Sequence, residues 1–132
     1  MKWSSKYVLN VQKMDTTHRE FAERVTEIEK ASVEDLAEAL DKLIAHTVEH
    51  FEAENQWMLE TKFPAYSEHY GEHQRVLLLL NVIRRVVLRT PEVVYDLAHD
   101  LSGWFDMHLA TMDSALAAHI KAENSSKRNC MP

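Results

Sequence analysis

The scarcity of glycine and proline is the feature that most restricts how this chain can fold. Its 132 residues contain two glycines and three prolines, whereas a sheet-rich domain needs many turns and builds them largely from these two residue types. A composition so poor in turn residues favours long helices joined by few connections. The length is that of one domain with a substantial core, so we predict a single domain over residues 1–132.

Apolar residues recur every three or four positions in four stretches, which is the pattern of amphipathic helices. The stripes cover residues 18–28, 36–57, 66–87 and 94–115. Helix starts are expected at Asp15, Ser32 and Thr90, which are favourable N-cap residues, and Pro64 ends the second helix. Short connections between such helices predict an all-α fold, an up-down-up-down antiparallel four-helix bundle. We expect an extended N-terminal arm over residues 1–14 and a polar tail over about residues 120–132.

Five of the eight histidines fall on these apolar stripes, namely His18, His50, His69, His73 and His108. Glu54 follows His50 by four residues, so the two side chains share one helical face, with roughly 5–6 Å between their Cβ atoms. Burying this ionisable pair is costly unless something compensates it, and a metal ion would do so. The alternative is a surface pair. Bundle interiors build metal sites from such side chains, and imidazole with carboxylate suits non-haem iron.

A second carboxylate, Asp113, follows His108 by five residues. Five residues turn a regular helix by about 140°, so an ideal helix would not aim both side chains at one point. Either Asp113 reaches around the helix, or the helix carries a π-bulge, a distortion that tends to occur at functional sites. Asp106 is an equally available carboxylate on the sequence, in which case Asp113 is exposed.

The charge balance and the cysteine count restrict the possible partners and the compartment. With 15 basic and 21 acidic side chains the chain has a net charge of −6, which disfavours nucleic acid and anionic membranes as partners. The longest apolar run, residues 76–80, is far shorter than the roughly 20 residues of a membrane span. A lone Cys130 requires no oxidising compartment, and no signal-type run follows Met1. We expect a cytoplasmic protein.

The four elements His18, His50-Phe51-x-x-Glu54, His69-x-x-x-His73 and His108-x-x-x-x-Asp113 occur together in this order. This set resembles the seven-ligand pattern of the hemerythrin family, and the resemblance covers roughly residues 3–118. It implies two iron ions bridged by an oxo or hydroxo group and by two carboxylates, those of Glu54 and Asp113. His69, His73 and His108 would bind one iron, and His18 and His50 the other, which keeps an open position for dioxygen.

The resemblance also implies a function, reversible binding of dioxygen for transport, storage or delivery. The alternative is a di-iron oxygen- or redox-sensing module that acts through a partner. The short polar tail, with no fused output domain, favours a carrier, and we expect a monomer that could supply an oxygen-consuming protein. The expected apolar lining is Phe51, Trp104, Phe105 and Leu109, with Phe105 standing where the family commonly has leucine.

Two enzyme classes compete with this interpretation. The zinc peptidase pattern HxxEH occurs at residues 46–50 and 69–73, but both copies borrow histidines from the larger set. Ferritin-like di-iron oxidases need Glu-x-x-His on two helices, and no glutamate here has a histidine three residues later. We therefore expect a binding protein that is not an enzyme. His46, His99 and His119 have no predicted role.

Overall fold

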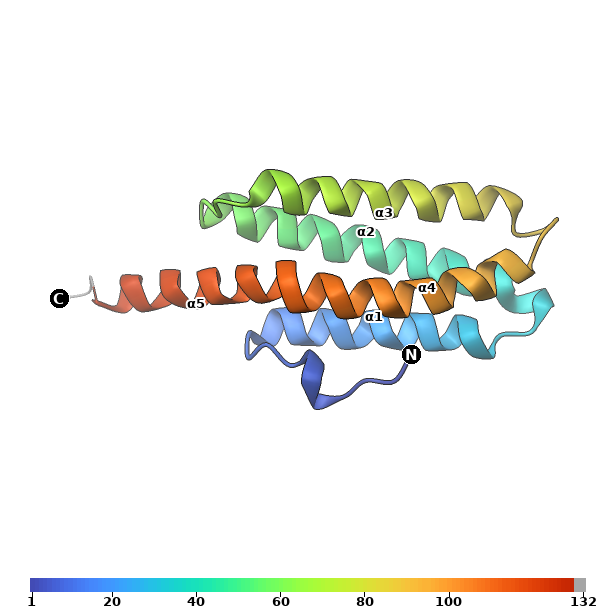
Figure 1. Ribbon diagram of the computed structural model, residues 1–132, viewed down its shortest axis with the longest axis horizontal. Helices are drawn as coiled ribbons and strands as arrows, with labels where there is room; N and C mark the ends of the chain where they lie inside the picture. Colours follow the sequence, from blue (N-terminus) through green and yellow to red (C-terminus); the bar gives the residue numbers. More distant parts are fainter. Residues whose placement is uncertain (130–132) are drawn as a thin grey trace.

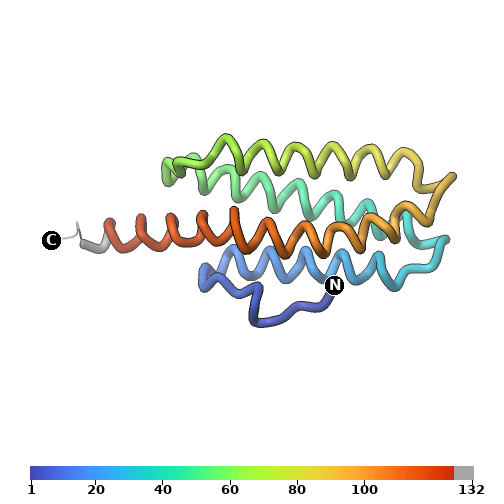
Figure 2. The backbone as a smooth tube through the Cα atoms, in the orientation of Figure 1, coloured from blue at the N-terminus to red at the C-terminus, as the bar shows by residue number. Residues whose placement is uncertain are grey.

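A computed structural model describes residues 1–129, and its regular elements within this range are all helical. The first three rods are α1 (Gln12–Lys30), α2 (Leu36–Glu60) and α3 (Tyr66–Val86). The last rod is continuous and joins α4 (Glu92–His108), the π-helical segment η3 (Leu109–Asp113) and α5 (Ser114–Asn129). The four rods lie side by side (Figure 1), and the chain reverses direction at each connection (Figure 2). The predicted up-down-up-down four-helix bundle is confirmed.

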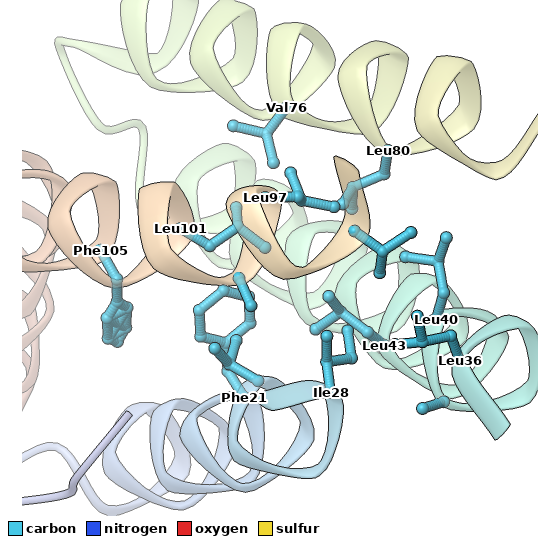
Figure 3. Packing of buried hydrophobic residues seen from close by; sticks show 14 of the residues in the cluster. Phe21, Ile28, Leu36, Leu40, Leu43, Val76, Leu80, Leu97, Leu101 and Phe105 are labelled. Carbon is cyan, nitrogen blue, oxygen red and sulfur yellow. The ribbon is translucent and has the colours of Figure 1, made fainter. Parts of the chain in front are cut away.

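Two apolar clusters form the core of the bundle. In the larger one Phe21 from α1, Leu43 from α2, Leu80 from α3 and Leu101 from α4 are buried and face one another (Figure 3). The smaller cluster consists of Val11, Met14, Met58, Phe63, Leu116, Ala117 and Ile120. Helix α1 packs against α2 and α4, and α2 packs against α3. The three-or-four spacing of these apolar positions gives every rod one buried face.

Seven buried histidine and carboxylate residues, here called the polar layer, lie between the two apolar clusters, and every rod contributes at least one of them. The polar layer consists of His18, His50, Glu54, His69, His73, His108 and Asp113. On α1, for example, Met14 belongs to the smaller cluster, Phe21 to the larger one, and His18 stands between them. The bundle therefore encloses its ionisable side chains at mid-height with apolar packing above and below.

The predicted N-cap role of Asp15 is wrong. Helix α1 begins at Gln12, and the carboxylate of Asp15 points back to the preceding loop. There it accepts hydrogen bonds from the backbone N–H groups of Leu9 at 2.8 Å and Asn10 at 3.0 Å. Asn10 has a positive φ of 62°, which asparagine tolerates better than most residues. Asp15 thus fixes the turn into the helix rather than the first helical N–H groups.

Two other predicted helix starts are displaced. The Ser32 hydroxyl donates to the Asp35 carboxylate at 3.1 Å and makes no backbone cap. A short 3-10 turn, η2 (Val33–Asp35), therefore precedes α2. Helix α4 begins at Glu92 with Pro91 at the cap position, because Thr90 turns its hydroxyl back to the carbonyl of Val86. Both starts lie near the predicted positions, as is usual for helix boundaries.

The segments outside the four rods also differ from the prediction. The segment before α1 contains a 3-10 turn, η1 (Ser5–Tyr7), and buries Tyr7 beside the last rod. The predicted polar tail from about residue 120 is helical as far as the structure extends, because α5 continues to Asn129. Ile120 is buried, and the ammonium group of Lys121 donates to the carbonyl of Leu9. Residues 130–132, including Cys130, lie outside the described residues.

Among the helices that the structure describes, none combines the length and the hydropathy that crossing a bilayer requires.

Candidate metal centre

The structure brings all seven predicted donor residues together in the polar layer. Each rod contributes, with one residue from α1, two from α2, two from α3 and two from the α4–η3 stretch. Their side chains are at most 5% exposed. Burial of two carboxylates and five imidazoles to this extent is costly unless positive charge compensates them.

The carboxylate of Glu54 faces two groups of histidines at once. Its Oε2 lies 3.0 Å from Nε2 of His18 and 2.8 Å from Nε2 of His50. Its Oε1 lies 3.1 Å from Nε2 of His73 and 3.4 Å from Nε2 of His69. One glutamate therefore presents one oxygen to each group.

Asp113 repeats this division. Its Oδ2 lies 3.2 Å from Nε2 of His18, whereas its Oδ1 lies 3.1 Å from Nε2 of His69 and 3.2 Å from Nε2 of His108. The site thus has a two-histidine half, His18 and His50, and a three-histidine half, His69, His73 and His108. Both carboxylates span the two halves, which is the arrangement that two bridged metal ions require.

The π-helical segment η3 is what directs Asp113 into the site. It covers the five residues from Leu109 to Asp113, so of the two predicted geometries the helix distortion is observed. The wider turn brings Asp113 to the same side as His108 and rotates the following residues with it. Thr111, inside η3, and Ala115, just after it, were predicted on the buried stripe but are exposed.

Electrostatics keep both carboxylates ionised. Burial raises the pKa of Glu54, but the charge of His50 and hydrogen bonds from the histidines outweigh it and hold the pKa well below its usual value. For Asp113 burial and the neighbouring Glu54 raise the pKa, and the contacts with His108, His18 and His69 reverse this and lower it. Two buried negative charges at the centre of the bundle attract cations.

The histidines respond to the same carboxylates. Burial lowers the pKa of His18, but the carboxylates of Asp113 and Glu54 outweigh it and raise the pKa to about 10. The same opposing effects raise the pKa of His69 to about 9. For His73 burial prevails over the attraction of Glu54, and the pKa is lowered.

The donor atoms fit metal ions. Within residues 1–129 the Nε2 atoms of His69, His73 and His108 are buried without a hydrogen-bond partner, as are Oε1 of Glu54 and both carboxylate oxygens of Asp113. The three nitrogens belong to one set of donor atoms lying within 4.8 Å of one another with Glu54 and Asp113, and a second set joins His18, His50 and Glu54. Imidazole with carboxylate suits iron, zinc and related ions.

The predicted apolar lining divides between the two halves. Phe51 stacks on the ring of His73, with centroids 3.9 Å apart and planes 6° apart, and Trp104 stacks on His108 at 4.6 Å. Phe105 places its ring 5.3 Å from that of His18, edge to face. Leu109 is buried at the start of η3. Phe105 thus contacts the two-histidine half through His18, and Phe51 also reaches this half, with its ring 5.3 Å from that of His50.

Three residues beside the site were not predicted to act there. Phe21 stacks on Phe105 at 5.0 Å, and its position three residues after His18 on one face was the available signal. Asn55 places its Oδ1 2.9 Å from Nδ1 of His73. Glu72 accepts a hydrogen bond from the indole N–H of Trp104 at 2.7 Å. Nothing in the sequence pairs Glu72 with Trp104, because the two are 32 positions apart and on different helices.

The geometry does not support a zinc peptidase site at either copy of the HxxEH pattern. Nε2 of His46 donates to the carbonyl of Thr17 at 3.1 Å, so that ring is engaged outside the polar layer. Glu49 is exposed, and the carboxylate of Glu72 contacts Trp104 and Arg75. Neither glutamate of the two copies faces the histidines. His119 donates to the carbonyl of Thr61 at 2.6 Å, and His99 is exposed.

Comparison with known proteins agrees with this arrangement. A family model described as the hemerythrin HHE cation binding domain matches residues 9–125. The chain belongs to the hemerythrin family. The matched hemerythrin region contains the complete polar layer and all four rods as far as residue 125.

Relatives within the hemerythrin family are similar over most of their lengths. The bacteriohemerythrin of Ralstonia nicotianae is 32% identical over 121 residues, covering 91% of this chain and 88% of that protein. That of Aquifex aeolicus is 27% identical over 114 residues, covering 81% and 87%. That of Stenotrophomonas maltophilia is 24% identical over 127 residues, covering 91% and 81%. The similarity thus extends over more than four-fifths of each of these three proteins.

Proposed function

We propose that this chain is a non-haem di-iron protein that binds dioxygen reversibly. The observation that carries the proposal is the division of both carboxylates between a two-histidine half and a three-histidine half. The family and the bacteriohemerythrin relatives support iron as the metal.

The two halves offer unequal numbers of donors. The three-histidine half would hold one iron with His69, His73, His108, Oε1 of Glu54 and Oδ1 of Asp113. The two-histidine half would hold the other with His18, His50, Oε2 of Glu54 and Oδ2 of Asp113. The second half would therefore offer its metal one protein donor fewer than the first, and dioxygen would bind on the side of His18 and His50. When bound, the iron pair supplies the two electrons that reversible dioxygen binding requires.

The surrounding residues protect this chemistry from water. Phe105 and Phe21 cover the two-histidine half with stacked rings, and both are at most 1% exposed. The apolar clusters above and below the polar layer exclude bulk solvent. Five imidazoles and only two carboxylates form a donor set that favours binding over oxidative turnover, so we propose a binding protein rather than an enzyme.

The same donor set serves a carrier and a sensing module, and the proposal concerns the dioxygen-binding step that they share. We further propose a monomer in the cytoplasm that could supply an oxygen-consuming partner.

The test is metal analysis combined with one optical spectrum. Purified protein is expected to contain close to two irons per chain, to be pale when reduced, and to become coloured when aerated and pale again when dioxygen is removed. Stoichiometric zinc without iron after iron-replete expression would contradict the proposal. His69→Gln is expected to lower the iron content, whereas His99→Gln, at an exposed position on α4, is expected to leave it unchanged.

A further inference from the structure

The histidines of the polar layer differ in whether their Nδ1 atom, which points away from the carboxylates, contacts another side chain. Each points Nε2 towards the carboxylates and Nδ1 away from them. Within the described part of the chain, the Nδ1 atoms of His18, His50, His69 and His108 are buried without a hydrogen-bond partner. Nδ1 of His73, in contrast, lies 2.9 Å from Oδ1 of Asn55. One imidazole of the five is therefore held from behind by another side chain.

We propose that Asn55 is a positioning residue of the metal centre, which fixes the tautomer of His73 and, as a neutral acceptor, limits how strongly this imidazole donates to the metal. This inference rests on the proposed function, because it concerns a ligand of the same site.

The position of Asn55 follows from the packing of α2 against α3. Asn55 directly follows Glu54 on α2, so one turn of this helix supplies both the carboxylate that faces Nε2 of His73, at 3.1 Å, and the amide that faces its Nδ1. Phe51, one turn earlier, stacks flat on the same ring at 3.9 Å. Helix α2 thus faces the His73 ring on one flat side, through Phe51, and at both nitrogens, through Glu54 and Asn55.

The hydrogen bond decides which nitrogen carries the proton. An amide oxygen can only accept, so Nδ1 of His73 must donate to it, and the lone pair then remains on Nε2, which faces the site. Such partners behind a ligating histidine set its tautomer, its orientation and its basicity.

The neutrality of Asn55 has a separate consequence. A carboxylate at this position would draw the Nδ1 proton more strongly and would make the ring a stronger donor, which stabilises the ferric state. It would also add a third negative charge beside Glu54 and Asp113. An amide makes the same hydrogen bond without either effect, so Asn55 favours the ferrous state that binds dioxygen.

The test compares three variants of the full chain. Asn55→Ala removes the acceptor, Asn55→Asp is nearly isosteric and replaces it with a charged one, and Gln56→Ala alters the neighbouring exposed amide, which contacts only Glu60 among the hydrogen bonds of the structure. Three quantities are measured: the affinity for iron and for zinc, the midpoint potential of the iron-loaded protein, and the nitrogen NMR shifts of His73 in the zinc-loaded protein.

Asn55→Ala is expected to weaken metal binding about 10–100-fold, the usual effect of losing such a partner, and to remove the Nδ1–H signature of a hydrogen-bonded His73. Asn55→Asp is expected to restore the affinity and to shift the midpoint potential to more negative values, and Gln56→Ala is expected to change nothing. An unchanged potential in Asn55→Asp, or an unchanged affinity and His73 spectrum in Asn55→Ala, would overturn the proposal. Because the zinc-loaded spectra do not require iron, a chain that binds no iron would contradict the di-iron function while leaving this inference testable.

Discussion

At the scale of single residues, position around a helix determines whether a carboxylate belongs to the site. Glu54 is fully buried and faces four histidines, whereas Glu52, two residues earlier on the same helix, is exposed. The two differ in chemistry only through the face of α2 that they occupy. Comparing them separates loss of a bridge from loss of a negative charge.

Glu54→Ala is expected to abolish binding of the metal pair, since it removes an oxygen from each half of the site. Its melting temperature should fall as well, because metal binding contributes to the free energy of folding. Glu52→Ala should retain both the metal content and the melting temperature. Metal analysis and thermal unfolding of the two variants check this, and equal effects would show that the face assigned to the site is wrong.

Phe105 is the predicted lining residue whose ring packs against His18 of the two-histidine half. It is 1% exposed, stacks on Phe21 and meets the edge of the His18 ring. Phe105→Leu should leave a small void, costing about 1 kcal/mol of stability. The added space beside the two-histidine half should speed both dioxygen association and oxidation to the ferric form, with metal content unchanged.

Stopped-flow mixing with dioxygen and the decay of the oxygenated spectrum measure both rates. Phe63→Leu is the control, because Phe63 is buried in the smaller apolar cluster. If neither rate differs between the two variants, Phe105 serves only as core packing.

At the scale of elements, Tyr7 is a buried side chain through which the segment before α1 contacts the last rod. The Tyr7 hydroxyl donates to the Asp106 carboxylate at 2.5 Å, and its ring packs on Phe105 with centroids 5.5 Å apart. Tyr7→Phe should cost about 1 kcal/mol through the lost hydrogen bond, and Tyr7→Ala about 3 kcal/mol through the lost packing as well. Urea unfolding checks both values.

Tyr70→Phe is the matched control for this prediction, since Tyr70 is 40% exposed on α3. Its free energy of unfolding should not change. Equal stability of Tyr7→Ala and the unaltered protein would show that the N-terminal segment is not held by this contact.

The helices themselves were predictable from the sequence, but their ends were not, and the π-helical turn was predicted only as one of two alternatives. Apolar spacing identifies four rods because burial of one face dominates helix stability in a bundle. Asp15 misled the prediction, because the same carboxylate that can cap a helix can equally close the loop before it. The spacing of His108 and Asp113 raised the π-helical turn as a possibility, but burial of both side chains and of Leu116 in the folded bundle is what decides for it.

The same limit applies to the site. The seven positions of the polar layer could be identified because ionisable residues on an apolar stripe stand out against their surroundings. The contact between Asn55 and His73 could not, because it joins two helices through side chains that are ordinary for a half-buried surface. Its functional meaning depends on which atom faces which, and only the folded chain provides that.

At the scale of the whole molecule, stability depends on the polar layer and therefore on pH. The pKa of His18 is raised from 6.5 to about 10 and that of His69 to about 9. A raised pKa stabilises the fold fully below the unfolded value of 6.5, and this contribution is lost as pH rises through the folded values. After removal of metal, the melting temperature should therefore decline between about pH 6.5 and 10.

His18→Gln should reduce this decline in the metal-stripped protein, whereas His99→Gln, at an exposed position, should retain it. Bound metal ions take the place of the protons, so the loaded protein should show a weaker dependence over the same range. Thermal unfolding across the pH range checks these expectations. A metal-stripped melting temperature that is constant from pH 6.5 to 10 would contradict the assigned charge balance.

The placement of the polar layer between two apolar clusters also affects how the helices align along the bundle axis. Leucine-rich helices can slide past one another by a turn and still bury apolar surface, so apolar contacts alone specify their axial register poorly. Here a one-turn slip of any rod would push an imidazole or a carboxylate into an apolar cluster, where its polar atoms find no partner. We expect a variant with all seven polar residues replaced by leucine or methionine to stay helical by circular dichroism but to lose the sharp, dispersed NMR spectrum of a single alignment. The ionisable residues that equip the bundle for chemistry would then also be the ones that set the axial register of its helices.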